Sequence, residues 1–265
     1  MSNFVEQVEP GVVRLALSGW WGRRVGYVVS AYLVRGVLVD TGFPKVRDEV
    51  MQFVRDMEPR GAIVTHWHED HAGNVQALAM AGVPLRMHSR CESALRAHPA
   101  IGMYRELVWG AAPRLSVPMT TFDPAPLEIV ETPGHTEDHV VVWDPERGIV
   151  VSGDLFIGVK VRVAHLHERP SQVLRSLRTV MSLSPRLLLD AHRGPVFDAT
   201  DVLRAKIDWM EETMGLILTL AGQGVDEREI QLRVLGKEDF VGYVSFGEYS
   251  KRAFVKSVIS ERSAV

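Results

Sequence analysis

The segment 65–74, which reads THWHEDHAGN, restricts the fold of this chain more than any other part of the sequence. It follows the apolar run GAIV at 61–64 and contains His66, His68, Asp70 and His71. Side chains two apart in extended chain point the same way, and a following helical turn would bring Asp70 and His71 to the same space. Because neutral imidazole and carboxylate are ligands that zinc prefers, the segment predicts a metal site at the end of a buried strand.

Further ligands have to come from elsewhere, because donors this close in sequence cannot complete one tetrahedral site with good geometry. Three candidates stand where later apolar runs meet loops, the usual place for functional side chains in layered α/β folds. Five histidines and two aspartates suit two metal ions with a shared carboxylate: His66, His68, Asp70, His71, His135, Asp154 and His192. The alternative, a set of ordinary surface histidines, leaves three coordinating residues at strand ends unexplained.

Strands and helices alternate over most of the chain. β-Branched and apolar runs between glycine-containing turns predict strands at 11–17, 26–35, 37–42, 61–66, 84–89, 127–132, 139–144, 148–154 and 185–192. Apolar residues at helical spacing predict helices at 45–57 and 73–82 and after Pro170. Residues 99–125 give no regular signal. The alternation predicts an α/β layer protein.

From about residue 199 the pattern is wholly helical. Apolar residues recur at helical spacing through 200–224, and Asp226 with Glu229 resembles a capping box at the start of the next helix. A last helix is expected at 246–260. These residues predict a helical appendage on the core.

Composition restricts the partners and the compartment. The formal net charge of −3 argues weakly against a dedicated nucleic-acid binder. A single cysteine, Cys91, excludes an intrachain disulfide and favours a reducing compartment. The N-terminus does not read as a signal peptide, and no run approaches the ~20 apolar residues that span a bilayer. We therefore expect a cytoplasmic protein that acts on a small molecule, without a membrane partner. The sequence leaves its oligomeric state open.

The motifs THWHEDHAGN, PGHTEDH, SGDLF and AHRGPV resemble the metallo-β-lactamase superfamily of hydrolases in order and spacing across residues 38–197. TPGHTEDHV and the helical end resemble its β-lactamase-like-protein-2 group. The resemblance implies a four-layer αβ/βα sandwich at 1–198, with the site at an edge between two sheets. It also implies a small helical, winged-helix-like region at 199–265.

The resemblance divides the ligands between two zinc ions, with iron or manganese as alternatives. One zinc would be held by His66, His68 and His135, the second by Asp70, His71 and His192, and Asp154 would bridge them. Asp70 and Asp154 are the predicted catalytic residues, with Asp70 orienting the nucleophile or shuttling a proton.

One departure concerns the last ligand, where the family usually has Gly-His-Gly and this chain has Ala191-His192-Arg193. Arg193 adds a bulky cation near the site and leaves the substrate open. The role of Trp20 and Trp21, at an expected hairpin tip, is equally open between a flap over the site and ordinary packing.

The net charge of the expected metal centre predicts hydrolysis. Two Zn²⁺ ions keep a net positive charge after Asp70, Asp154 and a bridging hydroxide are counted, which lowers the pKa of bound water and stabilises an oxyanion. The leading hypothesis is a dinuclear zinc hydrolase of a small ester, thioester or lactone.

Other functions stay open. A phosphodiesterase or endoribonuclease would need arginines in one groove leading to the metals: Arg162, Arg169, Arg175, Arg178 and Arg193. β-Lactam hydrolysis is a further alternative. So is iron-dependent oxidation, which His68 disfavours because the diiron pattern has a glutamate there. A non-catalytic binding module is disfavoured because every ligand position is filled.

Some residues carry weaker expectations. Asp40 could accept a hydrogen bond from a ligand imidazole or could be a simple turn aspartate. His139 is expected to shape its loop, and His165 and His167 are expected to face solvent. His88, His98 and Cys91 have no pattern behind them.

Overall fold

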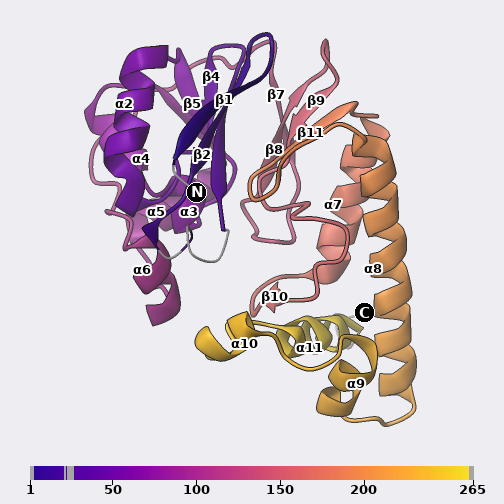
Figure 1. Ribbon diagram of the computed structural model, residues 1–265. Helices are drawn as coiled ribbons and strands as arrows, with labels where there is room; N and C mark the ends of the chain where they lie inside the picture. Colours follow the sequence, from indigo (N-terminus) through magenta and orange to yellow (C-terminus); the bar gives the residue numbers. More distant parts are fainter. Residues whose placement is uncertain (1–2, 21, 23–26, 263–265) are drawn as a thin grey trace.

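The computed structural model describes residues 3–20, 22 and 27–262, and it contains two mixed sheets that face each other (Figure 1). The first sheet has the order β1-β2-β3-β4-β5-β6, with β1 Phe4–Glu9, β2 Val12–Leu17, β3 Val29–Val34, β4 Val37–Val39, β5 Gly61–Val64 and β6 Leu85–Met87. The second has the order β12-β11-β9-β8-β7, with β7 Glu128–Glu131, β8 Val140–Asp144, β9 Ile149–Val151, β11 Leu187–Asp190 and β12 Gly194–Val196. A short antiparallel pair joins β10 Ala164–His165 to β13 Tyr249–Ser250.

Helices cover the outer faces of both sheets and form the C-terminal region (Figure 1). Those up to residue 109 are the 3₁₀ helix η1 Pro44–Val46 and the α-helices α2 Arg47–Met57, α3 Glu69–Ala72, α4 Val75–Met80, α5 Ser89–Ala97 and α6 Met103–Trp109. The later ones are α7 Pro170–Ser182, α8 Ala199–Gly222, α9 Glu227–Val234, α10 Phe240–Val244 and α11 Lys251–Arg262.

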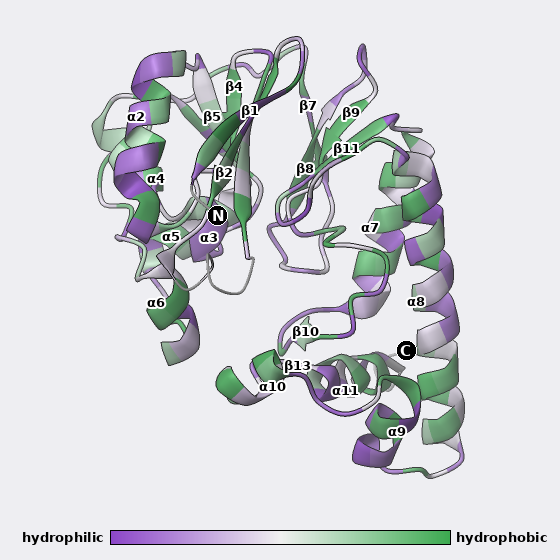
Figure 2. Ribbon diagram, viewed as in Figure 1, coloured by the Kyte–Doolittle hydropathy of each residue, from purple (hydrophilic) through white to green (hydrophobic). Residues whose placement is uncertain are grey.

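The core between the two sheets is apolar. Tyr32, Val39 and Ile63 of the first sheet pack with Val151 and Leu189 of the second in one buried cluster. The central strands β3, β4, β5, β8, β9 and β11 are buried along their whole length. The helices α2 and α8, by contrast, mix hydrophilic and hydrophobic residues (Figure 2). Strands buried on both faces and helices with one apolar side are what four layers require. The predicted αβ/βα sandwich with a helical appendage is confirmed.

Parallel pairing decides which strand ends meet. β4, β5 and β6 run parallel, and so do β9 and β11. The carboxyl ends of parallel strands lie at one edge of a sheet. The loops after β4, β5, β9 and β11 therefore meet at the edge of the sandwich that faces the C-terminal helices (Figure 1).

The predicted elements are found with shifted ends, and some elements were missed. β1 was not predicted, because its residues alternate without a strong apolar face, and all but two of them are exposed. Residues 99–125 were expected to be irregular, but α6 lies within them, and α5 just before them was also missed. The last helix begins at Lys251 rather than 246, because residues 249–250 form β13.

The long helix α8 is shared between two cores. Its first half, with Leu203 and Ile207, packs with α7 and the second sheet. Its second half, with Ile217, packs with Ile230 of α9 and Val255 of α11. The division at residue 198 therefore stays a prediction. Among the described residues, no helix has both the length and the apolar character that crossing a bilayer requires.

Candidate metal centre

The turn after β5 presents the histidine-rich segment. Strand β5 is fully buried, and His66 and His68 follow it before α3 begins. Asp70 and His71 lie in the first turn of α3, so the chain curls back toward the same point. All four side chains are buried, although three are imidazoles and one is a carboxylate.

Asp40, at the end of β4, stabilises this turn through contacts with Thr65 and His71. Its Oδ1 accepts a hydrogen bond from the Thr65 backbone N–H at 2.8 Å, and its Oδ2 lies 2.7 Å from His71 Nδ1. Its φ of 65° is left-handed, which a short polar side chain tolerates. Asp40 is therefore an acceptor for a predicted ligand imidazole as well as a turn residue.

The second sheet contributes three predicted ligands. Asp154 follows β9, and His135 lies in the loop between β7 and β8. His192 follows β11 in a turn whose backbone N–H at 192 donates to Asp190 Oδ1 at 2.7 Å. His192 Nδ1 lies 3.2 Å from the Val28 carbonyl oxygen, so Nδ1–H donates there and Nε2 points into the centre.

The structure brings all seven predicted residues together in two groups. The ligand atoms of each group lie within 4.8 Å of one another, and Asp154 belongs to both groups. The groups are His66, His68, His135 and Asp154, and Asp70, His71, Asp154 and His192. This division is the one that the family resemblance implies. Metal binding by these residues remains a prediction.

Asp154 turns a different oxygen toward each group. Its Oδ2 lies 3.4 Å from His135 Nε2. Its Oδ1 lies 3.1 Å from His71 Nε2 and 2.9 Å from His192 Nε2. A carboxylate in this position can bind two cations with one oxygen each.

The residues fit a pair of divalent cations. His66 Nε2, His71 Nε2 and Asp154 Oδ1 are buried, and within the described part of the chain none of them makes a hydrogen bond of normal geometry, despite the short distances from Asp154 Oδ1 to the imidazoles of His71 and His192. Buried polar atoms are normally paired, so such atoms need an explanation. Nδ1 of His71 contacts Asp40, and Nδ1 of His66 lies 3.1 Å from Thr65 Oγ1. Partners of this kind fix the tautomer of a metal-binding histidine.

Burial and charged neighbours together shift the pKa of His66 and that of His192 in opposite directions. Burial, together with the neighbouring imidazoles, holds the pKa of His66 well below its usual value. Burial acts in the same direction on His192, but Asp154 and Asp70 outweigh it and raise the pKa of His192 to about 9. Burial raises the pKa of Asp154, but His192 and His71 overcome it and hold that pKa well below its usual value. The same carboxylates that hold a proton here would attract a cation.

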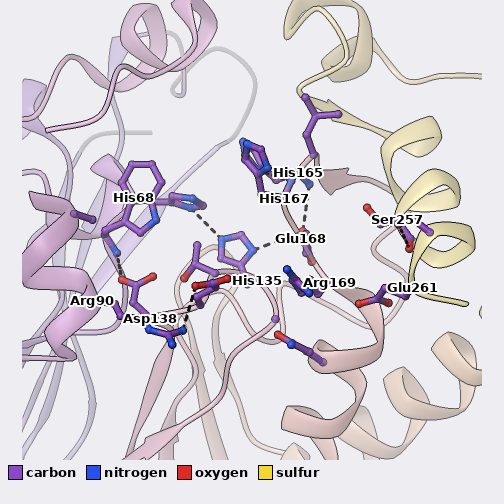
Figure 3. A pocket seen from close by; sticks show the side chains of 18 of the residues that line it. His68, Arg90, His135, Asp138, His165, His167, Glu168, Arg169, Ser257 and Glu261 are labelled. Carbon is purple, nitrogen blue, oxygen red and sulfur yellow. Dashed lines mark hydrogen bonds and ion pairs between the residues drawn. The ribbon is translucent and has the colours of Figure 1, made fainter. Parts of the chain in front are cut away.

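A cavity of about 840 Å³ opens beside the first group (Figure 3). His68 and His135 lie on its wall, together with Trp67 and Asp138. The opposite wall comes from residues 165–169 and from Ser257, Ser260 and Glu261 of α11. A substrate in this cavity would lie between the sandwich and the C-terminal helices.

The weaker predictions had mixed outcomes. His165 was expected to face solvent, but it is buried, and its Nε2 lies 3.2 Å from Glu248 Oε1. His167 is exposed as expected. His139 lies in neither group; its Nε2 accepts from the Asp154 backbone N–H at 3.1 Å, so it shapes the loop. Trp20 is half exposed and its role stays open.

Trp21 lies outside the described residues. Arg193 is exposed, and its guanidinium packs against Gly158. The sequence shows no functional pattern for His88, His98 or Cys91. His88 and His98 cap α5 at its two ends, and Cys91 is buried.

Several polar residues around the centre were missed. Asp138 Oδ2 accepts from the Trp67 backbone N–H at 2.8 Å, and Glu168 Oε2 lies 3.7 Å from His135 Nδ1. Arg105 forms a buried ion pair with Glu69, inside the histidine segment. Their proximity to sequence motifs could have pointed to Glu69, Asp138 and Glu168, but nothing in the sequence singled out Arg105.

Comparisons with known proteins identify the family of this chain and several of its relatives. The profile of the metallo-beta-lactamase superfamily matches residues 24–192. A Caenorhabditis elegans protein named beta-lactamase-like protein 2 homolog is 27% identical over 175 residues, 61% of this chain and 53% of that protein. The chain thus spans about half the length of this relative.

Two further matches extend over nearly the whole chain. A protein of Aspergillus terreus named atrochrysone carboxyl ACP thioesterase is 22% identical over 277 residues, 91% of this chain and 80% of that protein. A solved structure of a metallo-beta-lactamase family protein from Thermus thermophilus has a TM-score of 0.71 at 19% identity, and covers 98% of this chain and 96% of that chain. At this identity the structural likeness speaks for the fold alone.

Proposed function

The chain belongs to the metallo-beta-lactamase superfamily of hydrolytic enzymes, and from this premise we propose that it is a dinuclear zinc hydrolase of a small thioester, ester or lactone. The position of Asp154 carries the proposal, because its two oxygens face two separate groups of imidazoles. We propose that His66, His68 and His135 hold one cation and Asp70, His71 and His192 the other, with Asp154 shared.

Two bound zinc ions would supply a water of lowered pKa as the nucleophile and would polarise the substrate oxygen. The protein positions the reaction. Asp70 Oδ2 lies 3.7 Å from His71 Nε2 and 3.9 Å from His192 Nε2, so it can orient the nucleophile or carry its proton. The cavity beside His68 and His135 has room for the rest of the substrate.

A thioester is the substrate class that we place first. The Aspergillus terreus relative is named as a thioesterase and aligns with 91% of this chain. The walls of the cavity also carry hydrogen-bonding side chains, among them serines, Gln172 and carboxylates. Such a lining suits a substrate with a hydrogen-bonding arm better than a plain hydrocarbon chain.

The charges of the cavity favour a small molecule over a nucleic acid. Of the five arginines that a phosphodiesterase would use, Arg169 alone lines the cavity. The lining carries more carboxylates than arginines, namely Glu137, Asp138, Glu168 and Glu261 beside Arg90 and Arg169. This excess of carboxylates along the cavity wall disfavours a polyanion, so we keep phosphodiester hydrolysis as the second candidate. β-Lactam hydrolysis and iron-dependent oxidation have no supporting observation.

The test is a screen of the zinc-loaded protein against an acyl thioester, a lactone, bis(p-nitrophenyl) phosphate and a chromogenic β-lactam. We expect the thioester to be hydrolysed fastest. Asp154→Ala should lower this rate by about a hundredfold or more, because it removes the shared ligand. Asp201→Ala, a change at an exposed aspartate of α8, should leave the rate unchanged.

Two results would overturn the proposal. Full activity in Asp154→Ala would show that the two groups do not act through a shared carboxylate. Fast hydrolysis of the phosphodiester, with strong inhibition by salt, would establish the second candidate instead.

A further inference from the structure

A buried arginine lies beside the histidine segment. Arg105 of α6 is 3% exposed, and its Nε donates to Glu69 Oε1 at 2.8 Å while a terminal nitrogen donates to Glu69 Oε2. Its guanidinium also lies 5.2 Å from the centre of the Trp67 ring. Glu69 and Trp67 are the immediate neighbours of His68. Arg105 therefore fixes the part of the turn that carries a predicted ligand.

The C-terminal helical region reaches this arginine through one carboxylate. Glu248, between α10 and β13, places Oε1 3.6 Å from an Arg105 terminal nitrogen and 3.2 Å from His165 Nε2. Its backbone carbonyl accepts from the Leu166 N–H at 3.1 Å, which continues the β10–β13 pairing. Gly102 leaves the space that this carboxylate fills, since a Cβ there would lie 2.1 Å from Oε2.

His165 continues the contact to a second predicted ligand. Its Nδ1 accepts from the His167 backbone N–H at 3.2 Å, so the proton is on Nε2 and donates to Glu248. Its own backbone N–H donates to Glu168 Oε2 at 3.2 Å, and the same oxygen lies 3.7 Å from His135 Nδ1. His165, Glu168 and His135 lie together at the cavity (Figure 3).

We propose that Glu248 is a positioning residue of the metal centre: it joins the C-terminal helical region to His68 through Arg105 and Glu69, and to His135 through His165 and Glu168. The inference rests on the proposed function, because it assigns a role toward the group that would hold the first cation. It also gives the C-terminal region a part in the site besides forming a wall of the cavity.

Charge explains why a carboxylate is needed at this position. Arg105 is always protonated, and two carboxylates face its buried guanidinium. Without the charge of Glu248, Arg105 is less well compensated and raises the positive potential at His68. A cation near His68 and His135 then binds less tightly. The Nε2–H group of His165 also loses the Glu248 carboxylate as its acceptor, or keeps only a neutral oxygen in its place.

Glu248→Gln tests this role, because it keeps the shape and removes the charge. Binding of Zn²⁺ to the full-length protein is measured by competition with a chromophoric chelator, which needs no turnover. We expect the affinity of one of two zinc sites to fall about tenfold, as for other residues that support metal ligands. The absorption bands of the Co²⁺-loaded protein should change as well.

The matched control is Glu238→Gln. Glu238 lies in the same region, and among the described residues its carboxylate accepts from the backbone N–H groups of residues 239, 251 and 252. Its replacement should leave both affinities unchanged. His165→Phe removes the hydrogen bond to Glu248 from the other side and should weaken the same site, so the test survives if Glu248→Gln does not fold.

The outcomes separate the two proposals. If the wild-type protein binds fewer than two zinc ions, the proposed dinuclear centre is wrong. If it binds two and both Glu248→Gln and His165→Phe match its affinities, the positioning role is wrong. If Glu238→Gln weakens zinc binding as much as Glu248→Gln, the effect is one of general stability, which also overturns the inference.

Discussion

Asp40→Asn replaces one acceptor oxygen beside the proposed metal centre with an NH₂ donor and leaves the shape of the side chain intact. Asparagine tolerates the left-handed backbone at this position, where φ is 65°. Its amide oxygen can still accept from the Thr65 backbone N–H, as Asp40 Oδ1 does at 2.8 Å. Its NH₂ group, however, replaces the oxygen that lies 2.7 Å from His71 Nδ1. Two donors then face each other.

The imidazole of His71 relieves this conflict by carrying its proton on Nε2. That nitrogen lies 3.1 Å from Asp154 Oδ1, inside the second group of predicted ligands. A protonated nitrogen cannot bind a cation, so the cost of restoring the original tautomer weakens binding. Loss of such a supporting partner typically lowers metal affinity by about 10–100-fold, or about 1.4–2.7 kcal/mol. A hydrogen bond to a charged group has a similar net value of about 1.5–3 kcal/mol.

Stepwise zinc binding by chelator competition measures the effect. We expect one site to weaken and the other, built on His66, His68 and His135, to keep its affinity as an internal control. Asp144→Asn makes the same change at a buried aspartate paired with Arg35 at the opposite edge of the sheets, and should leave both sites unchanged. Equal affinities for wild type and Asp40→Asn, or an equal loss at both sites, would refute the proposed role of Asp40.

Three further predictions concern pH and stability. Asp154 and Asp70 outweigh burial and raise the pKa of His192 to about 9, and Asp154, Asp70 and Asp40 likewise raise the pKa of His71 in the same group. Protons therefore compete with zinc, and the affinity of one site should rise at least about tenfold per pH unit up to a pH of about 9; a pH-independent affinity would contradict this. Burial lowers the pKa of Lys206 from 10.5 to about 8, so the unfolded state binds the proton more tightly. Between these values the free energy of unfolding of the wild type should rise by about 3 kcal/mol relative to Lys206→Met, as denaturation at a series of pH values can measure. Leu189→Ala, in the core between the sheets, should cost about 2–5 kcal/mol in urea denaturation, whereas Leu232→Ala at an exposed position should cost less than about 0.5 kcal/mol.

Local patterns predicted the centre because its ligands lie next to strong signals. His66 and His68 follow the buried run GAIV, and Asp154 and His192 end two other buried runs. A buried strand needs consecutive apolar residues, so its end is visible in the sequence, and so is the polar residue that follows it. The predicted ligands could therefore be named without knowing how the strands pair.

The surroundings of the centre could not be predicted in this way. Arg105 lies in a segment that gave no regular signal, and Glu248 lies far from every motif. Their proposed role depends on a contact that the fold creates: a terminal nitrogen of Arg105 lies 3.6 Å from Glu248 Oε1. His165 was expected in solvent because its burial depends on β13 and α11, which pack on it from more than 80 residues away.

The sequence by itself determined the alternation of strands and helices, the residues that come together in the two groups, and the family, since each depends on residue types at short spacing. Only the tertiary structure decided which oxygen of Asp154 faces which imidazoles, which nitrogen of each histidine is held by a partner, and that the C-terminal helices complete the cavity. These features depend on the parallel pairing of β4 with β5 and of β9 with β11, and on the docking of β13 beside β10. Such contacts join residues far apart in the chain, and no local pattern encodes them.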